Sequence, residues 1–185
     1  MKNNYLLVHG SFGSPFSNWL PWLRKKIESR NIGGVYTPDF PTGVGYQNYE
    51  NWSNLLKIYM KAGILNENTI IYAHSIAPVF ISKFLIENKL KVKRLVFVCG
   101  FNNYVGINEE YDEVNKSMYL DNLAEIKKYC DDIVCYYSKN DPYVKYETEK
   151  EFADTIANKQ VIIDDGGHLN SESGYTEFPE LLEYL

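Results

Sequence analysis

Apolar positions along the chain follow two patterns. Short runs of β-branched and aromatic residues indicate buried strands, whereas longer segments with apolar residues every three or four positions indicate helices. The short runs predict strands at 5–9, near Val35, and at 69–73, 95–99, 133–137 and 161–163. The periodic segments predict helices at 19–27, 49–60, 76–87, 123–129, 143–157 and 178–185. Segment 100–121 is polar and aromatic without clear periodicity, so we expect it to be the longest irregular segment.

The alternation of strands and helices predicts an α/β protein. Strands joined through helices form a mostly parallel sheet, and the helices then cover both of its faces. We therefore expect a three-layer α/β/α sandwich with about six strands. The sequence shows no repeat and no linker, which predicts a single domain over 1–185. In such folds, functional side chains gather beyond the carboxyl ends of the strands.

Composition and charge narrow the class of partner. Hydrophobic residues make up 45% of the chain and charged residues 23%, as in ordinary globular proteins. The formal net charge is -5 and no basic block stands out, so we expect no nucleic-acid partner. No apolar stretch approaches the length of a membrane span. The expected partner is a small molecule, and the sequence indicates no particular protein partner.

Two further features predict a cytoplasmic protein. The apolar run at the N-terminus is too short for a signal peptide and lacks a cleavage site. Three cysteines, Cys99, Cys130 and Cys135, are an odd number without metal-ligand spacing or a C-x-x-C pair, which is typical of reduced thiols. We expect buried core cysteines and neither a metal site nor a cofactor.

The stretch T-I-I-Y-A-H-S-I-A-P places Ser75 between a predicted strand and a predicted helix. A sharp strand-to-helix bend presents a serine hydroxyl above the sheet edge, and its usual form is G-x-S-x-G. Here Ala73 and Ala77 take the two small positions. Pro78 lies in the first helical turn, where its missing N–H costs no hydrogen bond. Taken alone the match is weak, because many buried serines have small neighbours.

A serine nucleophile needs a base, and the sequence offers three histidines. His9 ends the first predicted strand, and His74 adjoins the serine and should point away from it. His168 follows the last predicted strand and is the best base by position. The competing interpretation is a histidine in an ordinary polar turn.

Asp141, just beyond the predicted strand 133–137, is the best candidate to orient that base. The competing interpretation is a turn former, because aspartate before proline often plays that part. Asp164 and Asp165 lie so near His168 that the turn would have to fold back on itself. Asp131 and Asp132 precede their strand, at the wrong edge of the sheet.

Together these residues follow the order Ser75, Asp141, His168, with intervals of 66 (141 minus 75) and 27 (168 minus 141). This is the chain order of α/β-hydrolases. The oxyanion hole should use the backbone N–H of Ile76 and one from the turn after the first strand, where we favour Ser11 and keep Phe12 as the alternative. That turn fits neither glycine-rich nucleotide motif, which argues against nucleotide binding.

The sequence resembles the small serine hydrolases of the retinoblastoma-binding-protein type and their YdeN-like bacterial relatives. The shared features run from the H-G turn at His9 through paired tryptophans, the A-H-S elbow at Ser75 and the S-x-x-D-P turn at Asp141. The tail G-H-L-N-S-E-S-G-Y-T-E-F-P, which begins at Gly167, is the most specific of them. The chain departs from the family where Ala77 replaces a common glycine and Phe178 a common tryptophan.

The resemblance implies a compact α/β-hydrolase fold with a Ser75, Asp141, His168 triad. We therefore expect a carboxylesterase-like hydrolase that acts on a small acyl ester through an acyl-enzyme. Two alternatives stay open: an amidase or peptidase with the same triad, and a protein-binding module that has kept the fold without turnover. The L-x-C-x-E motif is absent, so no retinoblastoma-protein partner is carried over. Segment 100–121 should border the substrate pocket. Trp19 and Trp22 should either pack on the sheet or form part of the wall of that pocket.

Overall fold

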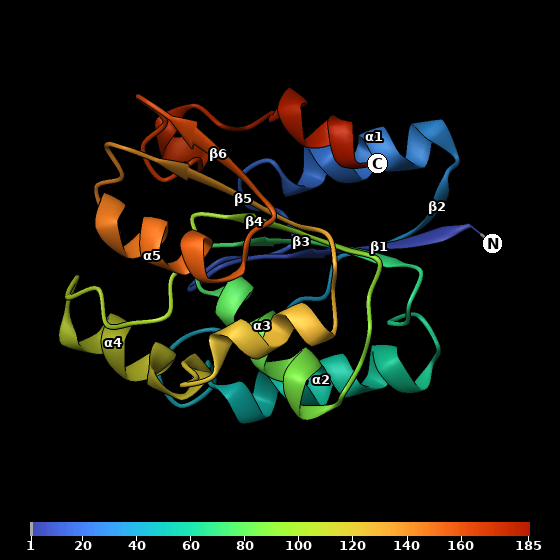
Figure 1. The fold of residues 1–185 in the computed structure, drawn as a ribbon, viewed down its shortest axis with the longest axis horizontal. Helices are drawn as coiled ribbons and strands as arrows, with labels where there is room; N and C mark the ends of the chain where they lie inside the picture. Colours follow the sequence, from blue (N-terminus) through green and yellow to red (C-terminus); the bar gives the residue numbers. More distant parts are fainter. Residues whose placement is uncertain (1) are drawn as a thin grey trace.

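The computed structural model describes residues 2–185, and its central element is one parallel sheet (Figure 1). Within these residues, the sheet has six strands in the order β2-β1-β3-β4-β5-β6. The strands are β1 (Asn3–Val8), β2 (Gly33–Tyr36), β3 (Thr69–His74), β4 (Arg94–Val98), β5 (Ile133–Ser138) and β6 (Lys159–Ile163). Every neighbouring pair is parallel. The predicted α/β class and the six strands are confirmed.

Helices cover both faces of the sheet, as predicted for a three-layer sandwich (Figure 1). The α-helices are α1 (Leu20–Arg30), α2 (Tyr49–Lys61), α3 (Ala77–Glu87), α4 (Glu109–Asn115) and α5 (Tyr146–Ile156). Apolar side chains of α2, α3 and α5 pack into one core cluster, and those of α1 and the C-terminal segment pack into a second. The sheet therefore separates two hydrophobic cores.

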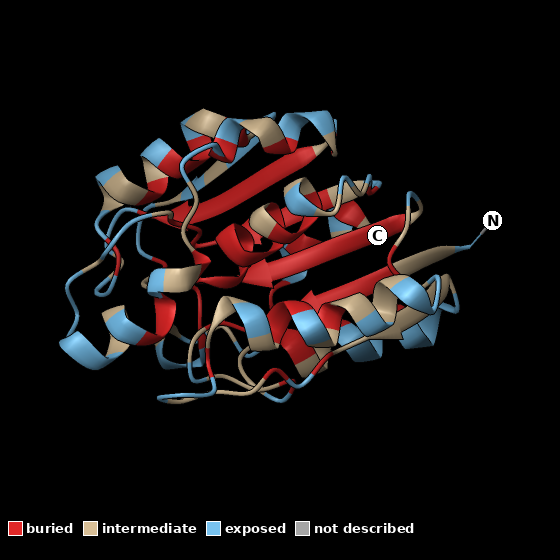
Figure 2. Ribbon diagram, turned by 90° about the horizontal axis from the view of Figure 1, so that it is seen from below, coloured by how far each residue is buried: buried red, intermediate tan, exposed pale blue. Residues whose placement is uncertain are grey.

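The four central strands, β1, β3, β4 and β5, form the innermost layer because side chains on both of their faces are mostly buried and apolar. In β1, Leu6 and Val8 belong to the core with α2, α3 and α5, whereas Tyr5 and Leu7 belong to the core with α1. This alternation follows from the two-residue period of a strand. Figure 2 shows the result, with buried residues along the strands and exposed residues on the outer sides of the helices.

The expectation of an irregular 100–121 segment is wrong in part, because this segment contains α4 and a 3₁₀ turn, Lys116–Met118. The Asn108 side chain caps α4 by accepting a hydrogen bond from the N–H of Tyr111. Five of the seven residues of this helix are acidic or carry an amide, so its sequence shows no apolar periodicity. Capping and packing, more than sequence periodicity, define this helix.

Three predicted helices differ in kind or in extent. Segments Leu123–Lys128 and Pro179–Tyr184 form 3₁₀ helices. Helix α5 begins at Tyr146 and not at 143, because the backbone before it is folded into a turn by Asp141. Among the helices of residues 2–185, none has both the length and the apolar character needed to cross a membrane.

Candidate active site

Ser75 lies in the sharp bend between β3 and α3, at the carboxyl edge of the sheet. Its φ of 64° falls in the left-handed region, which residues other than glycine adopt only where the surroundings hold them there. The backbone N–H of Ser75 donates to the carbonyl oxygen of Val98 at 2.9 Å, which ties the bend to β4. The predicted strand-to-helix elbow is therefore the local structure at this serine.

The turn after β1 lies directly against Ser75, and Gly10 makes that approach possible. A Cβ atom built on Gly10 would be 2.7 Å from the Cβ of Ser75 and 3.3 Å from its hydroxyl oxygen. A distance of 2.7 Å is shorter than real Cβ contacts, so a larger residue would push the two segments apart. Gly10 is thus required by the closeness of the two backbones.

Replacing Gly10 with alanine is expected to lower kcat by about 10²-fold, because a displacement of roughly 1 Å at a nucleophile has that order of effect. The comparison variant is Gly13→Ala in the same turn, where the added Cβ would be 3.1 Å from the carbonyl oxygen of Gly10, which would have to move by only a few tenths of an ångström, so the loss of kcat should be smaller. Steady-state kinetics on a chromogenic ester would measure both variants. Equal kcat values for the two variants would contradict the close-approach argument.

His168 and Asp141, on separate loops, form a hydrogen-bonded pair. Nδ1 of His168 lies 2.5 Å from Oδ2 of Asp141, and the two side chains are 8% and 0% exposed. The other carboxylate oxygen of Asp141 accepts the backbone N–H groups of Tyr143 at 2.8 Å and Val144 at 3.0 Å. Burial opposes ionisation of Asp141, but the hydrogen bonds from His168 and the two N–H groups outweigh it and lower the pKa of the carboxyl group.

The loops that carry this pair are tied together by side chains from the end of β5. The Ser138 hydroxyl accepts the N–H of Gly166 at 3.0 Å, and the Asn140 side-chain oxygen accepts the N–H of Gly167 at 2.8 Å. The hydroxyl of Ser138 also donates to Asn140 at 2.7 Å. These contacts set the position of His168 relative to Asp141.

The other two histidines have structural partners. Nε2 of His74 lies 2.9 Å from the carbonyl oxygen of His168, and because a carbonyl only accepts, His74 donates here. Burial, with a smaller contribution from neighbouring His168, lowers the pKa of His74 to about 3, so its ring is neutral. His9 donates through Nδ1 to Gly10 and accepts the N–H of Phe40 at Nε2. Both rings therefore support the loops around Ser75.

Ser75 and His168 line the same hollow, which has a volume of about 330 Å³. Asp141 lies behind His168 and does not line it. Ile107 and Tyr111, from segment 100–121, lie on its wall, as expected for that segment. The full set of lining residues is Gly10, Ser11, Phe12, Gly13, Ser17, Asn18, His74, Ser75, Ile107, Tyr111, Tyr143, His168, Asn170 and Glu172.

Side chains distant in sequence hold the turn that was expected to stabilise an oxyanion. The N–H of Phe12 donates to the Gln47 side chain at 3.1 Å, so it already has an acceptor. Gln47 in turn donates to Asn115 at 2.8 Å, and the hydroxyl of Ser11 donates to the same Asn115 oxygen at 2.8 Å. Of the two candidates, only the N–H of Phe12 has an acceptor among residues 2–185, and the N–H of Ser11 remains free to donate.

Tyr111 is a residue whose place in the hollow the sequence did not predict individually. Burial is the main cause that raises the pKa of its phenol, and the nearby hydroxyls of Ser11 and Ser75 partly oppose that rise. Tyr111 therefore shares the hollow with the nucleophile candidate and with the turn that follows β1. The whole segment 100–121 was expected to border the pocket. Within that segment, only the aromatic character of Tyr111 indicated that this residue could form part of the wall.

A cluster of potential metal ligands overlaps the histidine–aspartate pair. Atoms of Cys99, Asp141, Glu149 and His168 that can bind a metal all lie within 4.8 Å of one another. However, Nδ1 of His168 is bonded to Asp141. Burial raises the pKa of the Cys99 thiol well above its usual value. Burial is also the main cause that raises the pKa of Glu149 to about 9, so both groups keep their protons at neutral pH. We therefore interpret these residues as the packing environment of Asp141 and not as a metal site.

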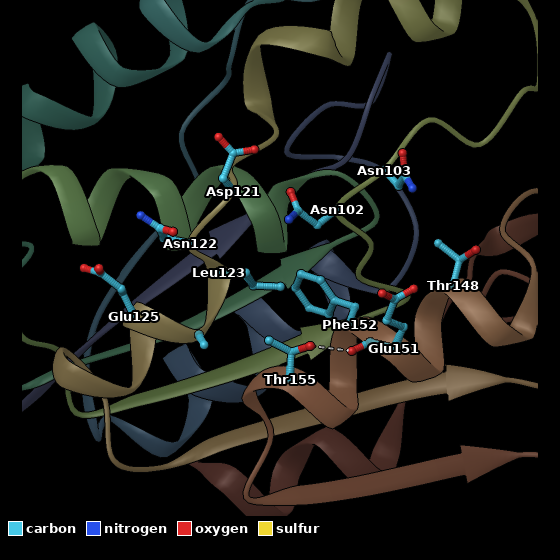
Figure 3. Close-up of a pocket in the computed structure, with 11 residues that line it drawn as sticks. Asn102, Asn103, Asp121, Asn122, Leu123, Glu125, Thr148, Glu151, Phe152 and Thr155 are labelled. Atoms are coloured by element: carbon cyan, nitrogen blue, oxygen red, sulfur yellow. Dashed lines mark hydrogen bonds between the residues drawn. The ribbon is translucent and has the colours of Figure 1, made fainter.

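A second hollow, of about 370 Å³, lies between α5, the segment after β4 and the start of the 3₁₀ helix Leu123–Lys128 (Figure 3). Its lining residues are mostly amides, hydroxyls and acids: Asn102, Asn103, Asp121, Asn122, Leu123, Ala124, Glu125, Thr148, Glu151, Phe152 and Thr155. It contains no histidine or cysteine and none of Ser75, Asp141 and His168. The chemical groups, and not the size of the hollow, distinguish the candidate active site.

The two tryptophans expected near the first helix do not line the hollow beside Ser75. Trp19 is fully buried, and its indole N–H donates to the carbonyl oxygen of Leu169 at 3.1 Å. Its ring also packs edge-on against Phe178. Trp22 borders a different surface hollow with residues of α1 and Thr176. Packing is therefore the role of Trp19.

Comparison with known proteins identifies the family. The family model described as serine hydrolase matches residues 5–185. The YdeN protein of Bacillus subtilis (strain 168), whose name marks it as a candidate hydrolase, is 24% identical over 188 residues, covering 100% of this chain and 95% of YdeN. The crystal structure of the ydeN gene product from B. subtilis has a TM-score of 0.83 at 24% identity, covering 98% of this chain and 96% of that chain.

More distant structures share the fold. The structure of Est1E from Butyrivibrio proteoclasticus with ferulic acid bound has a TM-score of 0.71 at 13% identity, covering 98% of this chain and 88% of that one. A protein from Pectobacterium atrosepticum, described as a candidate YdeN-like hydrolase, has a TM-score of 0.66 at 14% identity, covering 100% of this chain and 89% of that one. The sheet order, the faces covered by helices and the match over 5–185 lead to one conclusion: the chain belongs to the serine hydrolase family and is a hydrolase with the α/β-hydrolase fold.

Proposed function

We propose that the protein hydrolyses small acyl esters, with Ser75 as nucleophile, His168 as general base and acid, and Asp141 as the group that orients His168. The observation that carries this proposal is the buried hydrogen bond between Asp141 and His168 beside a hollow that Ser75 also lines. Nucleophile, base and orienting carboxylate are the three parts that acyl transfer through a serine requires.

In the first half of the proposed reaction, the hydroxyl oxygen of Ser75 attacks the carbonyl carbon of the ester. Nε2 of His168 takes the hydroxyl proton, while Nδ1–H stays bonded to Asp141, whose negative charge stabilises the imidazolium. The tetrahedral intermediate collapses when the bond to the alcohol oxygen breaks. His168 gives its proton to that oxygen, so an alcohol leaves and an acyl-Ser75 ester remains.

The negative oxygen of the tetrahedral intermediate needs hydrogen-bond donors that are already in place. We assign this role to the backbone N–H groups of Ile76, at the start of α3, and Ser11. Phe12 was the alternative, but its N–H donates to Gln47. The start of α3 adds a favourable contribution, because the amino end of a helix carries partial positive charge.

In the second half of the proposed reaction, water replaces the alcohol. His168 takes a proton from the water as its oxygen attacks the acyl carbon, and then returns that proton to the oxygen of Ser75 as the acyl bond breaks. A carboxylic acid leaves, and the hydroxyl of Ser75 is restored. These steps use only water and groups of the chain itself, and they need no cofactor.

The dimensions of the hollow favour a small substrate. About 330 Å³ is near the lower end of the size range of ligand pockets. Phe12, Ile107, Tyr111 and Tyr143 supply apolar and aromatic wall for an acyl group. Because Est1E, which shares the fold, was solved with ferulic acid bound, feruloyl esters belong in the substrate panel beside short alkyl esters.

We further propose that the reaction takes place in a reducing compartment such as the cytoplasm. The three cysteines, Cys99, Cys130 and Cys135, are all buried and unpaired. Free buried thiols are typical of proteins kept reduced, whereas secreted proteins of this size often carry disulfides.

A fluorophosphonate probe tests the proposed nucleophile, because it phosphonylates serines activated in this way. Peptide mapping of the labelled protein should find the probe on Ser75, and a panel of esters and matched amides should show faster turnover of the esters. Faster turnover of the amides would favour an amidase. A protein that neither reacts with the probe nor hydrolyses any member of the panel would overturn the proposal.

A further inference from the structure

Glu149 has a buried carboxyl group that takes no part in the steps of the proposed reaction. It lies in the first turn of α5 and is 1% exposed, although the residues on either side of it, Thr148 and Lys150, are only half-buried. Within residues 2–185, neither of its carboxyl oxygens has a hydrogen-bond partner. An unpaired buried carboxyl group is costly, so its presence calls for a physical explanation.

The surroundings of Glu149 point to Asp141. An oxygen of Glu149 lies within 4.8 Å of a carboxylate oxygen of Asp141, of Sγ of Cys99 and of a ring nitrogen of His168. These three are the titratable groups that face it, from the ends of β4, β5 and β6. Burial first, and the charge of Asp141 second, raise the pKa of Glu149 to about 9. At neutral pH the group is therefore a neutral hydrogen-bond donor beside a carboxylate.

Asp141 has acceptor capacity left for such a donor. One of its oxygens accepts two backbone N–H groups, and the other accepts only Nδ1–H of His168. A carboxylate oxygen can accept two hydrogen bonds. An oxygen of Glu149 lies within 4.8 Å of this carboxylate, so the donor and the free acceptor position are close together.

We propose that Glu149 is a positioning residue, whose protonated carboxyl group donates to Asp141 and holds that carboxylate in the orientation that binds His168. This inference rests on the proposed function of Asp141. Glu149 does not line the hollow, so it acts through Asp141 and not on the substrate. Loss of the proton would place a second negative charge beside Asp141 and disturb the pair.

Two variants separate donation from packing. Glu149→Leu keeps most of the volume but removes the donor, and kcat is expected to fall about tenfold with little change in KM, since a hydrogen bond to a charged group has about this effect. Glu149→Gln keeps N–H donors and cannot ionise, so its kcat at pH 7 should stay within about threefold of the parent. The control is Glu151→Gln, an exposed acid on the same helix, which should leave kcat unchanged.

The pH profile supplies a readout that packing alone would not change. In the parent protein kcat should fall above about pH 9, where Glu149 loses its proton, and this loss should be absent in Glu149→Gln. Rates must be corrected for spontaneous ester hydrolysis. If Glu149→Leu does not fold, the pH profiles of the parent and Glu149→Gln still show whether ionisation of Glu149 causes the alkaline loss of kcat.

Stability gives a readout independent of activity. The pKa of Glu149 is about 9 when folded and 4.5 in the ordinary case, so between these values the unfolded chain binds fewer protons than the folded one. Stability contributed by this group therefore falls as pH rises from about 4.5 to 9. The Tm of Glu149→Gln minus that of the parent should increase over that range.

The outcomes are distinct from those that test the proposed function. Activity that depends on Ser75, with a Glu149→Leu variant that folds and keeps full kcat, would overturn the role of Glu149 alone. An alkaline loss of activity that persists in Glu149→Gln would do the same. Activity that survives loss of Ser75 would overturn the proposed function first, whatever Glu149 does.

Discussion

Replacing Ser75 with alanine is expected to lower kcat by about 10⁴- to 10⁶-fold, the range found when a serine nucleophile is removed from a triad. Alanine has no hydroxyl, so no acyl-enzyme forms and the fluorophosphonate probe has no site of attack. The residual rate would come from the oxyanion donors and from binding. Stopped assays with purified protein at high concentration would measure this residual rate.

The fold should survive this change. Ser75 is 5% exposed, its backbone is already held in the left-handed region, and its N–H bond to Val98 does not involve the side chain. Ser29→Ala, an exposed serine on α1, is the matched control and should keep full activity. A Ser75→Ala protein that keeps more than a tenth of the parent kcat would show that hydrolysis takes place elsewhere.

Much of the fold could be predicted because a parallel sheet covered on both faces needs strands that are apolar throughout. The run from Thr69 to His74 is an example, since every residue of β3 is buried. The same logic placed Ser75, Asp141 and His168 at one edge of the sheet. Helix α4 could not be predicted, because it is only seven residues long and its stability comes from a cap and from packing.

The side chains that support the site could not be predicted from the sequence, for a different reason. Gln47 and Asn115 are 68 residues apart and meet only in the folded chain, where they fix the turn at Ser11 and Phe12. Glu149 looks like one more acid of an amphipathic helix, since the pattern of α5 does not reveal that this position faces Asp141. Tertiary packing, and not local pattern, decides which polar residues become buried.

Replacing Asp141 with asparagine is expected to lower kcat by about 10⁴-fold, the effect seen when the orienting aspartate of a triad is changed in this way. The amide oxygen of asparagine can still accept the N–H groups of Tyr143 and Val144. Its NH₂ group would then face Nδ1 of His168, where an acceptor is needed. The ring would take the tautomer with hydrogen on Nε2, and that nitrogen could no longer accept the proton of Ser75.

Kinetics and stability check this prediction together. KM should change little, because Asp141 does not line the hollow. Asp164→Asn is the matched control, since Asp164 is an exposed acid paired with Lys139 and makes no contact with His168. Because the pKa of Asp141 is lowered on folding, its contribution to stability is present above the ordinary value of 3.8 and is lost as pH falls below it. The difference in Tm between the parent and Asp141→Asn should therefore narrow in acid, and a parent-like kcat for Asp141→Asn would show that another group orients His168.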